Sequence, residues 1–194
     1  MRLATGGLVV ILTAVVAATT AASAPGSRTG ICGSPLRDLK TLSDPARTLV
    51  FFRPQATTIA AINRRQMPSA TPTVRTPGFA RHVWRVAAQI TQYKLDADGA
   101  IHLILFDAND YMIAEMPSPV CLAENTRNRR SIVDARRAFE SRCGVATPNW
   151  RSLGAVVSIS GVGLWDYPRG QRGHARNYAE LSPVTAIRFV AGCT

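Results

Sequence analysis

The chain has 194 residues, with 23 Lys and Arg against 12 Asp and Glu, so its formal net charge is +11. Its length fits one domain with a sizeable core and leaves no room for several large domains. Nearly all of the positive charge is arginine, because Lys40 and Lys94 are the only lysines. Two interpretations stay open: an anionic partner (nucleic acid, an acidic glycan or lipid headgroups) or an ordinary basic surface. The arginines are scattered, without the basic stripe interleaved with aromatics that is typical of nucleic-acid binders.

Residues 1–24 have the pattern of a secretory signal peptide. Arg2 supplies a positive charge, residues 3–20 carry none, and small residues follow up to Ala24. We therefore expect a secreted, extracytoplasmic protein with no transmembrane segment once this leader is cleaved. The alternative is retention as a membrane anchor, because the stretch is close to the roughly 20 residues that span a bilayer.

Four cysteines follow the leader, and an oxidising compartment would let them form two disulfides. Three pairings are possible from sequence. We favour Cys32 with Cys193, which would tie the two ends of the mature domain together. The remaining bridge would join Cys121 to Cys143 and connect the start of a helix to its end. A zinc site is not expected, since the chain lacks a C-x-x-C pair and the spacings are wide.

Residues 25–80 are expected to form an irregular N-terminal arm that wraps on the domain. The pattern predicts a short helix over 35–42, a brief strand over 49–52, and a second short helix capped by Thr57. Several prolines between Pro68 and Gly78 then indicate an extended connector.

From residue 81 onward the sequence predicts a domain of five strands and one helix. The first strand begins at His82, with apolar residues alternating from Trp84 to Ile90. The apolar set then shifts to Tyr93 and Leu95, which predicts a bulge in a strongly curved strand. Two further strands are expected over residues 101–106 and 111–116.

A helix is predicted over residues 131–142, where Ser131 and Asp134 have the spacing of a capping box. Strands over 156–162 and 184–190 complete the order β-β-β-α-β-β. This mainly-β order with one helix is that of a five-stranded oligonucleotide/oligosaccharide-binding (OB) barrel, which we expect over residues 81–194. A small sandwich is the alternative.

The densest polar segment, Gly161–Val184, joins the last two strands, and its four glycines permit sharp turns and close approach to a ligand. Three interpretations compete: hydrogen bonds that order a long loop, binding of an anion or a sugar, and acid/base or metal chemistry. We assign no catalytic residue, metal or cofactor, because no spacing here matches a metal or nucleophile signature. The candidate ligand-binding residues are Trp165, Asp166, Arg169, His174, Arg176, Asn177 and Glu180.

The stretches ATTIAAIN, DADGAIHLILFD and MIAEMPSPVC, together with the 161–184 segment, resemble a group of small exported bacterial proteins without an assigned function. The similarity covers nearly the whole mature chain and implies export, but it implies no activity. Relatives tend to carry His in place of Arg169 and Ser182, and many carry Asp in place of Ala100. If those side chains bound a metal or moved protons, this chain has lost them.

The first hairpin also resembles the staphylococcal-nuclease type of OB barrel, which implies calcium-dependent phosphodiester cleavage with Asp98, Asp107 and Glu115 as carboxylates. Ala100 stands where the key turn carboxylate would be expected. We therefore expect a non-catalytic binding module, with a nuclease of this type and a structural cell-envelope protein as alternatives. His102 is expected to be a packing residue rather than a ligand.

Overall fold

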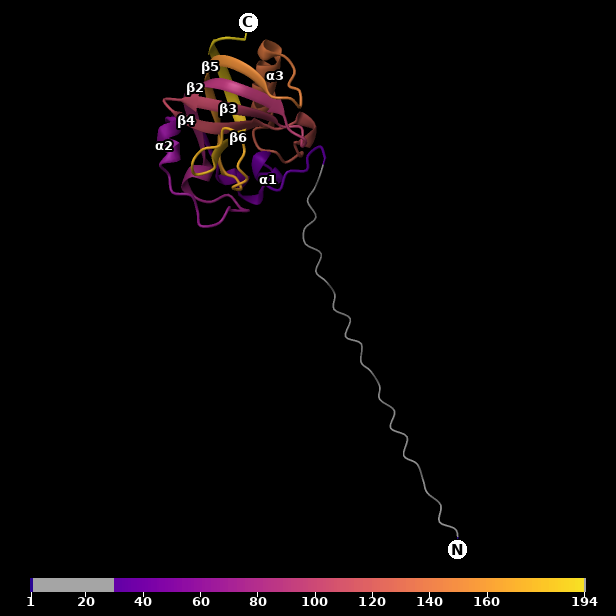
Figure 1. The fold of residues 1–194 in the computed structure, drawn as a ribbon. Coiled ribbons are helices and arrows are strands. Elements are labelled where there is room, and N and C mark those ends of the chain that lie inside the picture. The colour runs from indigo at the N-terminus through magenta and orange to yellow at the C-terminus, as the bar shows by residue number, and fades with distance from the viewer. Residues whose placement is uncertain (2–29, 194) are drawn as a thin grey trace.

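The computed structural model describes residues 1 and 30–193, so the expected signal peptide lies outside the described residues apart from Met1 (Figure 1). No helix in this part of the chain is long and apolar enough to cross a membrane. The elements, in chain order, are α1 (Arg37–Lys40), β1 (Phe51–Ala56), α2 (Ile59–Asn63), β2 (His82–Leu95), β3 (Ile101–Asp107), β4 (Asp110–Met116), α3 (Arg129–Cys143), β5 (Arg151–Trp165) and β6 (Ala179–Ala191), with 3₁₀ turns η1 (Pro45–Leu49), η2 (Gly78–Arg81) and η3 (Pro119–Cys121).

The molecule is mainly β, as expected, and its six strands form one sheet in the order β1-β2-β3-β4-β6-β5. An additional pairing of β2 with β5 closes a ring of hydrogen bonds through β2, β3, β4, β6 and β5. Within the ring, β4 and β6 are parallel and the other pairs are antiparallel. The expected order of three strands, a helix and two strands is confirmed. β1 lies outside the ring and pairs in parallel with the start of β2.

The predicted bulge in β2 is confirmed. The register of β2 shifts between Ile90 and Gln92 against both of its antiparallel neighbours, β3 and β5. An inserted residue reverses the side-chain alternation, so Ile90 and Tyr93 are both buried although they are three positions apart. The bulge therefore lets one long strand contribute to the core on either side of a bend.

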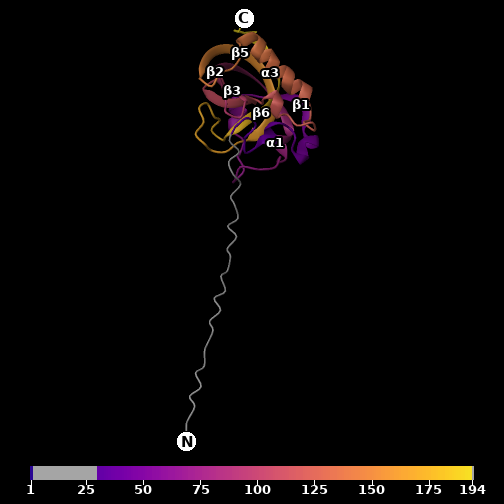
Figure 2. The same cartoon turned by 90° about the vertical axis from the view of Figure 1, so that its right-hand side faces the viewer.

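Helix α3 begins at Arg129, two residues before the expected start, and the predicted capping box is wrong. Asn128 occupies the N-cap position in the left-handed region with φ 57°, and Ser131 hydrogen-bonds to its side chain at 3.1 Å. The predicted apolar face is confirmed, and it packs against β6 along one side of the sheet (Figure 2). Its fully or nearly buried members are Ile132, Ala135 and Phe139.

Buried polar contacts of Arg75 join separate parts of the N-terminal arm. Arg75, expected in an extended connector, is 2% exposed and donates to Asp44 Oδ2 from Nε and Nη2 at 3.2 and 2.9 Å. It also donates to the carbonyl oxygens of Leu39 and Ala80, both at 2.9 Å. This one guanidinium therefore joins α1, the residue Asp44 before η1, and η2 into one packed unit.

Two local expectations for the arm are corrected. The second short helix is capped by Thr58 rather than Thr57, since Thr58 Oγ1 accepts from the Ala61 N–H at 3.1 Å. The first strand covers Phe51–Ala56 and not residues 49–52, because residues up to Leu49 form the turn η1.

Two glycines of the Gly-rich segment permit close packing between parts of the chain, because a side chain at either position would overlap a neighbouring residue. Gly163 lies in β5, where a Cβ would overlap the carbonyl oxygen of Phe79 in η2. A Cβ on Gly161 would lie 2.8 Å from Cβ of Leu181 in β6. These positions let other parts of the same chain approach β5 closely, so the expected approach of a ligand does not apply to them.

The disulfides differ from the expected pairing, because Cys32 is joined to Cys121 and Cys143 to Cys193. The reason is geometric. Cys32 lies at the β2–β3 turn, where its N–H donates to the Asp98 carbonyl near Cys121, whereas Cys143 ends α3, which packs on β6 shortly before Cys193. A disulfide tolerates a Cα separation of only about 7 Å. Each observed bridge therefore joins neighbours in space, with Cα separations of 5.3 and 4.8 Å, and the two disulfides fit an oxidising or extracellular environment.

Candidate functional site

A cleft of about 610 Å³ opens at the end of the sheet where the arm meets the β2–β3 turn and the β5–β6 loop. Figures 1 and 2 show α1 and the β5–β6 loop at this end. The side chains that give the cleft its chemical character are basic, acidic and aromatic. They are Lys40, Lys94, His102, Glu115, Trp150 and Arg169.

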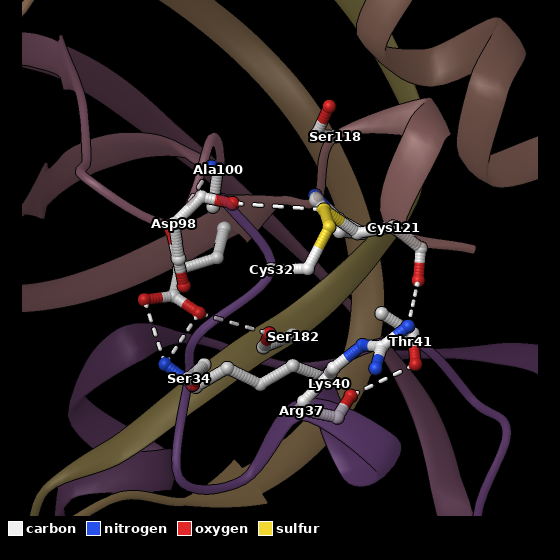
Figure 3. Close-up of a pocket in the computed structure, with 12 residues that line it drawn as sticks. Cys32, Ser34, Arg37, Lys40, Thr41, Asp98, Ala100, Ser118, Cys121 and Ser182 are labelled. Carbon is white, nitrogen blue, oxygen red and sulfur yellow. Dashed lines mark hydrogen bonds and ion pairs between the residues drawn. A yellow bond between two sulfur atoms is a disulfide. The ribbon is translucent and has the colours of Figure 1, made fainter. Parts of the chain in front are cut away.

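Glu115 and Lys40 form a buried ion pair in the cleft. Lys40 Nζ lies 2.7 Å from Oε2 and 2.9 Å from Oε1 of Glu115, and the two side chains are 7% and 6% exposed. Ser182 Oγ donates to the same carboxylate at 3.2 Å. Figure 3 shows Lys40 and Ser182 close together below the Cys32–Cys121 disulfide, in a small adjoining cavity of about 20 Å³. Glu115, a charged residue at the end of an apolar strand, is therefore paired with a lysine from the arm.

Two more carboxyl groups surround the same ammonium group. Lys40 Nζ lies 3.6 Å from Oδ2 of Asp166 and 3.9 Å from Oε2 of Glu180, whose side chains are each 2% exposed. Burial by itself would lower the pKa of Lys40, but the attraction of the three carboxyl groups outweighs it and raises that pKa. Lys40 therefore stays charged and acts as the central cation of this buried cluster.

The carboxyl groups of the cluster differ in proton affinity. Burial opposes ionisation of Asp166, but Lys40 and Arg169 outweigh it and lower the Asp166 pKa. Burial, together with repulsion from Glu115, raises the pKa of Glu180 well above its usual range. A proton on Glu180 can be shared with Asp166, and each residue has a buried oxygen without another partner among the described residues. When Glu180 carries that proton, the cations Lys40 and Arg169 balance the remaining carboxylates of Glu115 and Asp166.

A second polar group forms the wall of the cleft at the end of β2. Asp96 Oδ2 lies 3.2 Å from Nδ1 of His102, and Asp96 Oδ1 lies 2.6 Å from Nζ of Lys94. Burial disfavours the charge, but hydrogen bonds from His102 and Lys94 prevail and lower the pKa of Asp96 to about 2. His102 is 3% exposed, as expected of a packing residue. Its Nε2, however, is buried without a hydrogen-bond partner in the described part of the chain.

Trp150 forms an aromatic surface in the cleft with cations on it. The Lys94 ammonium lies 5.2 Å and the Arg172 guanidinium 5.4 Å from the ring centroid. The ring of His102 meets Trp150 edge-on at 5.3 Å between centroids. Arg172 is exposed, so one of these cations is available to a molecule in the cleft.

The structure brings together three of the seven predicted ligand-binding residues. Arg169 lines the cleft and donates to Asp166 at 2.7 Å, and Glu180 lies in the same buried cluster. Arg169 is 46% exposed at its side chain, whereas Asp166 and Glu180 are covered. Arg169 is therefore the member of the set that a ligand can reach.

The other four predicted residues lie elsewhere. Trp165 is 5% exposed and packs on Phe79 at 4.8 Å between ring centroids, as a core residue. The remaining three belong to contacts within the chain: His174 stacks on Tyr178, Arg176 pairs with Asp110 at 2.6 Å, and Asn177 donates to the carbonyls of Ile62 and Arg65. These four residues therefore do not line the cleft with Arg169.

The three carboxylates of the nuclease resemblance are also not assembled as a set. Asp98 lies in the β2–β3 turn and accepts from the Ala100 N–H at 3.0 Å, whereas Asp107 ends β3 at the opposite turn. Of the three, Glu115 lies in the cluster with Lys40. Asp98 and Glu115 both line the cleft, but the carboxylate with a donor atom within 4.8 Å of Glu115 and His102 is Asp96.

Sequence reasoning did not identify Lys40, Asp96, His102 and Trp150 as candidate site residues. Two signals were available. Lys40 is one of only two lysines in an arginine-rich chain, and Glu115 is a charged residue inside an apolar strand. Their pairing joins residues 75 positions apart, which no local pattern predicts.

Comparisons with known proteins give little guidance. No family model matches the chain, and no curated protein matches it. Among solved structures, the chain is similar to a putative aspartyl-tRNA synthetase from Leishmania major Friedlin, with 12% identity and a TM-score of 0.44. The similarity covers 71% of this chain and only 21% of that protein.

Proposed function

We propose that this protein is an exported, disulfide-stabilised OB-like module that binds an anionic ligand in the cleft between the β2–β3 turn and the β5–β6 loop. The strand ring runs β2-β3-β4-β6-β5, with a parallel β4–β6 pair and α3 between β4 and β5. This is the arrangement expected of an OB barrel numbered from β2. Two disulfides and the signal-peptide pattern of residues 1–24 support export.

The position of the cleft is the observation that carries the proposal. OB barrels bind oligonucleotides and oligosaccharides with the face of their second and third strands and with the loops between strands 1 and 2 and strands 4 and 5. In this chain those loops are the β2–β3 turn and the β5–β6 loop, and both line the cleft.

The charges of the cleft favour an anion as the ligand. Lys40 is neutralised by buried carboxylates, but Arg169 and Arg172 extend from the β5–β6 loop into accessible positions. Guanidinium groups bind phosphate and carboxylate in planar, bidentate geometry. Trp150 lies beside them and provides a ring on which a sugar or base can stack.

Binding is tested best with Arg172→Ala. Arg172 is exposed, and among residues 30–193 its side chain donates only to Gln92, at 3.2 Å, so its removal leaves no described buried charge unpaired. The protein would be titrated with single-stranded oligonucleotides and with a sulfated glycan at 150 mM salt, following tryptophan fluorescence. Trp84 and Trp165 are buried, so Trp150 is the indole that responds to a ligand in the cleft.

Arg137→Ala is the matched control, because it removes the same charge from the exposed surface of α3. We expect Arg172→Ala to weaken binding about tenfold, the effect of losing one charge-assisted contact, and Arg137→Ala to have little effect. Equal losses in the two variants would show binding by overall basicity and would contradict the proposal, as would binding that disappears at physiological salt.

A further inference from the structure

We propose that Asp96, His102 and Glu115 form a binding site for a divalent transition-metal ion in the wall of the cleft. Each residue offers one donor atom, and the three donor atoms lie within 4.8 Å of one another. His102 and Glu115 are directly opposite each other on the antiparallel strands β3 and β4, and Asp96 follows the end of β2. Three adjacent strands therefore hold the donors in place.

A second observation at the same place points to a ligand. His102 is 3% exposed, and its Nε2 is buried without a hydrogen-bond partner among the described residues. A buried polar atom without a partner is costly, and native proteins rarely retain one without a reason. A cation bound between the three residues would give this imidazole the partner that it lacks.

The donor set identifies the class of ion. One imidazole with two carboxylates suits Zn²⁺ or Mn²⁺, whereas Ca²⁺ and Mg²⁺ favour all-oxygen ligands. Three protein donors leave a coordination position open, as in zinc sites that bind a water or a substrate. His102 and Glu115 line the cleft, so that position would face its interior.

Lys40 sets a limit on the affinity. Its ammonium contacts both oxygens of Glu115, and a carboxylate has about four lone-pair positions, so a cation can share this group with the lysine. The positive charge of Lys40 opposes a second cation, so the site should bind zinc more weakly than a comparable site without such a neighbour. The proposal does not depend on an anionic ligand, because the metal can be titrated alone.

The test uses the oxidised protein without a polyhistidine tag, titrated with Zn²⁺ and with Mn²⁺ by calorimetry. The matched variants are His102→Gln and Asp96→Asn, with His174→Gln and His82→Gln as controls, which together cover all three histidines of the chain. Asp96→Asn is the milder change, because the Asp96 side chain is 25% exposed. We expect one Zn²⁺ per chain in the wild type, at least about tenfold weaker binding in the first two variants, and unchanged binding in the controls.

A measurement on the wild type makes the outcome independent of whether the variants fold. Paramagnetic Mn²⁺ broadens NMR signals near the site at which it binds. Broadening centred on His102 and Glu115 supports the proposal. Broadening centred elsewhere, no binding of either ion, or equal zinc affinity in folded His102→Gln and wild type would each overturn it.

Discussion

Replacing Lys40 with methionine tests the buried ion cluster directly. The side chain keeps its approximate length but loses the charge that lies within 3.9 Å of Glu115, Asp166 and Glu180. Removing one partner of a buried ion pair costs about 3–5 kcal/mol, because the other charge stays buried without compensation. Lys40 is 7% exposed at its side chain, so screening by solvent does not reduce this figure.

For a domain of this size, each kcal/mol shifts Tm by about 2–4 °C, so Lys40→Met should lower Tm by about 6–20 °C. Urea unfolding of the oxidised protein, followed by far-UV circular dichroism, measures the change in free energy of unfolding. The loss should become smaller towards acidic pH. Without Lys40, the carboxyl groups are more readily protonated in the folded variant, and their protonation removes the unpaired charge.

Lys94→Met is the control. It removes the only other lysine of the sequence, and Lys94 also lines the cleft. Lys94 and its partner Asp96 are 29% and 25% exposed, and a partly exposed pair contributes about 0–1 kcal/mol. The double variant Lys40→Met/Glu115→Gln should be more stable than Lys40→Met alone, since it removes the charge that was left unpaired. If Lys40→Met costs no more than Lys94→Met, the ion cluster does not stabilise the fold as argued.

Three further predictions follow from the packing and the charges. Gly163→Ala should lower the free energy of unfolding by about 1–3 kcal/mol, because a Cβ there overlaps the Phe79 carbonyl, and unchanged urea stability would contradict this contact. Peptide mapping without reduction should yield a Cys32–Cys121 peptide, and its double replacement by serine should cost about 4–5 kcal/mol in the chain-entropy model; finding Cys32 bonded to another cysteine would refute the arm's position. Glu180 has a raised pKa, so its contribution to stability is full below its ordinary value near 4.5 and is lost as the pH rises. Glu180→Gln should therefore gain stability relative to the wild type between pH 4.5 and 7, by at most about 1.4 kcal/mol per pH unit, and a pH-independent difference in urea unfolding would argue against a protonated Glu180.

The pairing of the cysteines is a wrong expectation that only the tertiary structure corrects. Cys121 and Cys143 were expected to bridge the start and end of the helix, yet a helix of this length separates its ends by about 20 Å. The seven residues between Cys121 and α3 are nevertheless long enough to run back along the helix, so helix length alone does not exclude the bond. The positions of Cys32 beside the β2–β3 turn and of Cys193 after β6 decide the pairing, and both depend on how distant segments pack.

The sequence alone determined the elements whose signal is local. The alternating apolar residues of β2, its bulge after Ile90 and the buried face of α3 are periodic patterns, and the structure confirms each of them. Only the tertiary structure decided the cleft and its contents. Lys40 reaches Glu115 across 75 residues, and Asp96 and His102 meet only because a hairpin closes between them. Such contacts depend on how the arm and the ring of strands pack together. Hydrophobic periodicity predicts single helices and strands, and it carries no information on which of them meet in space.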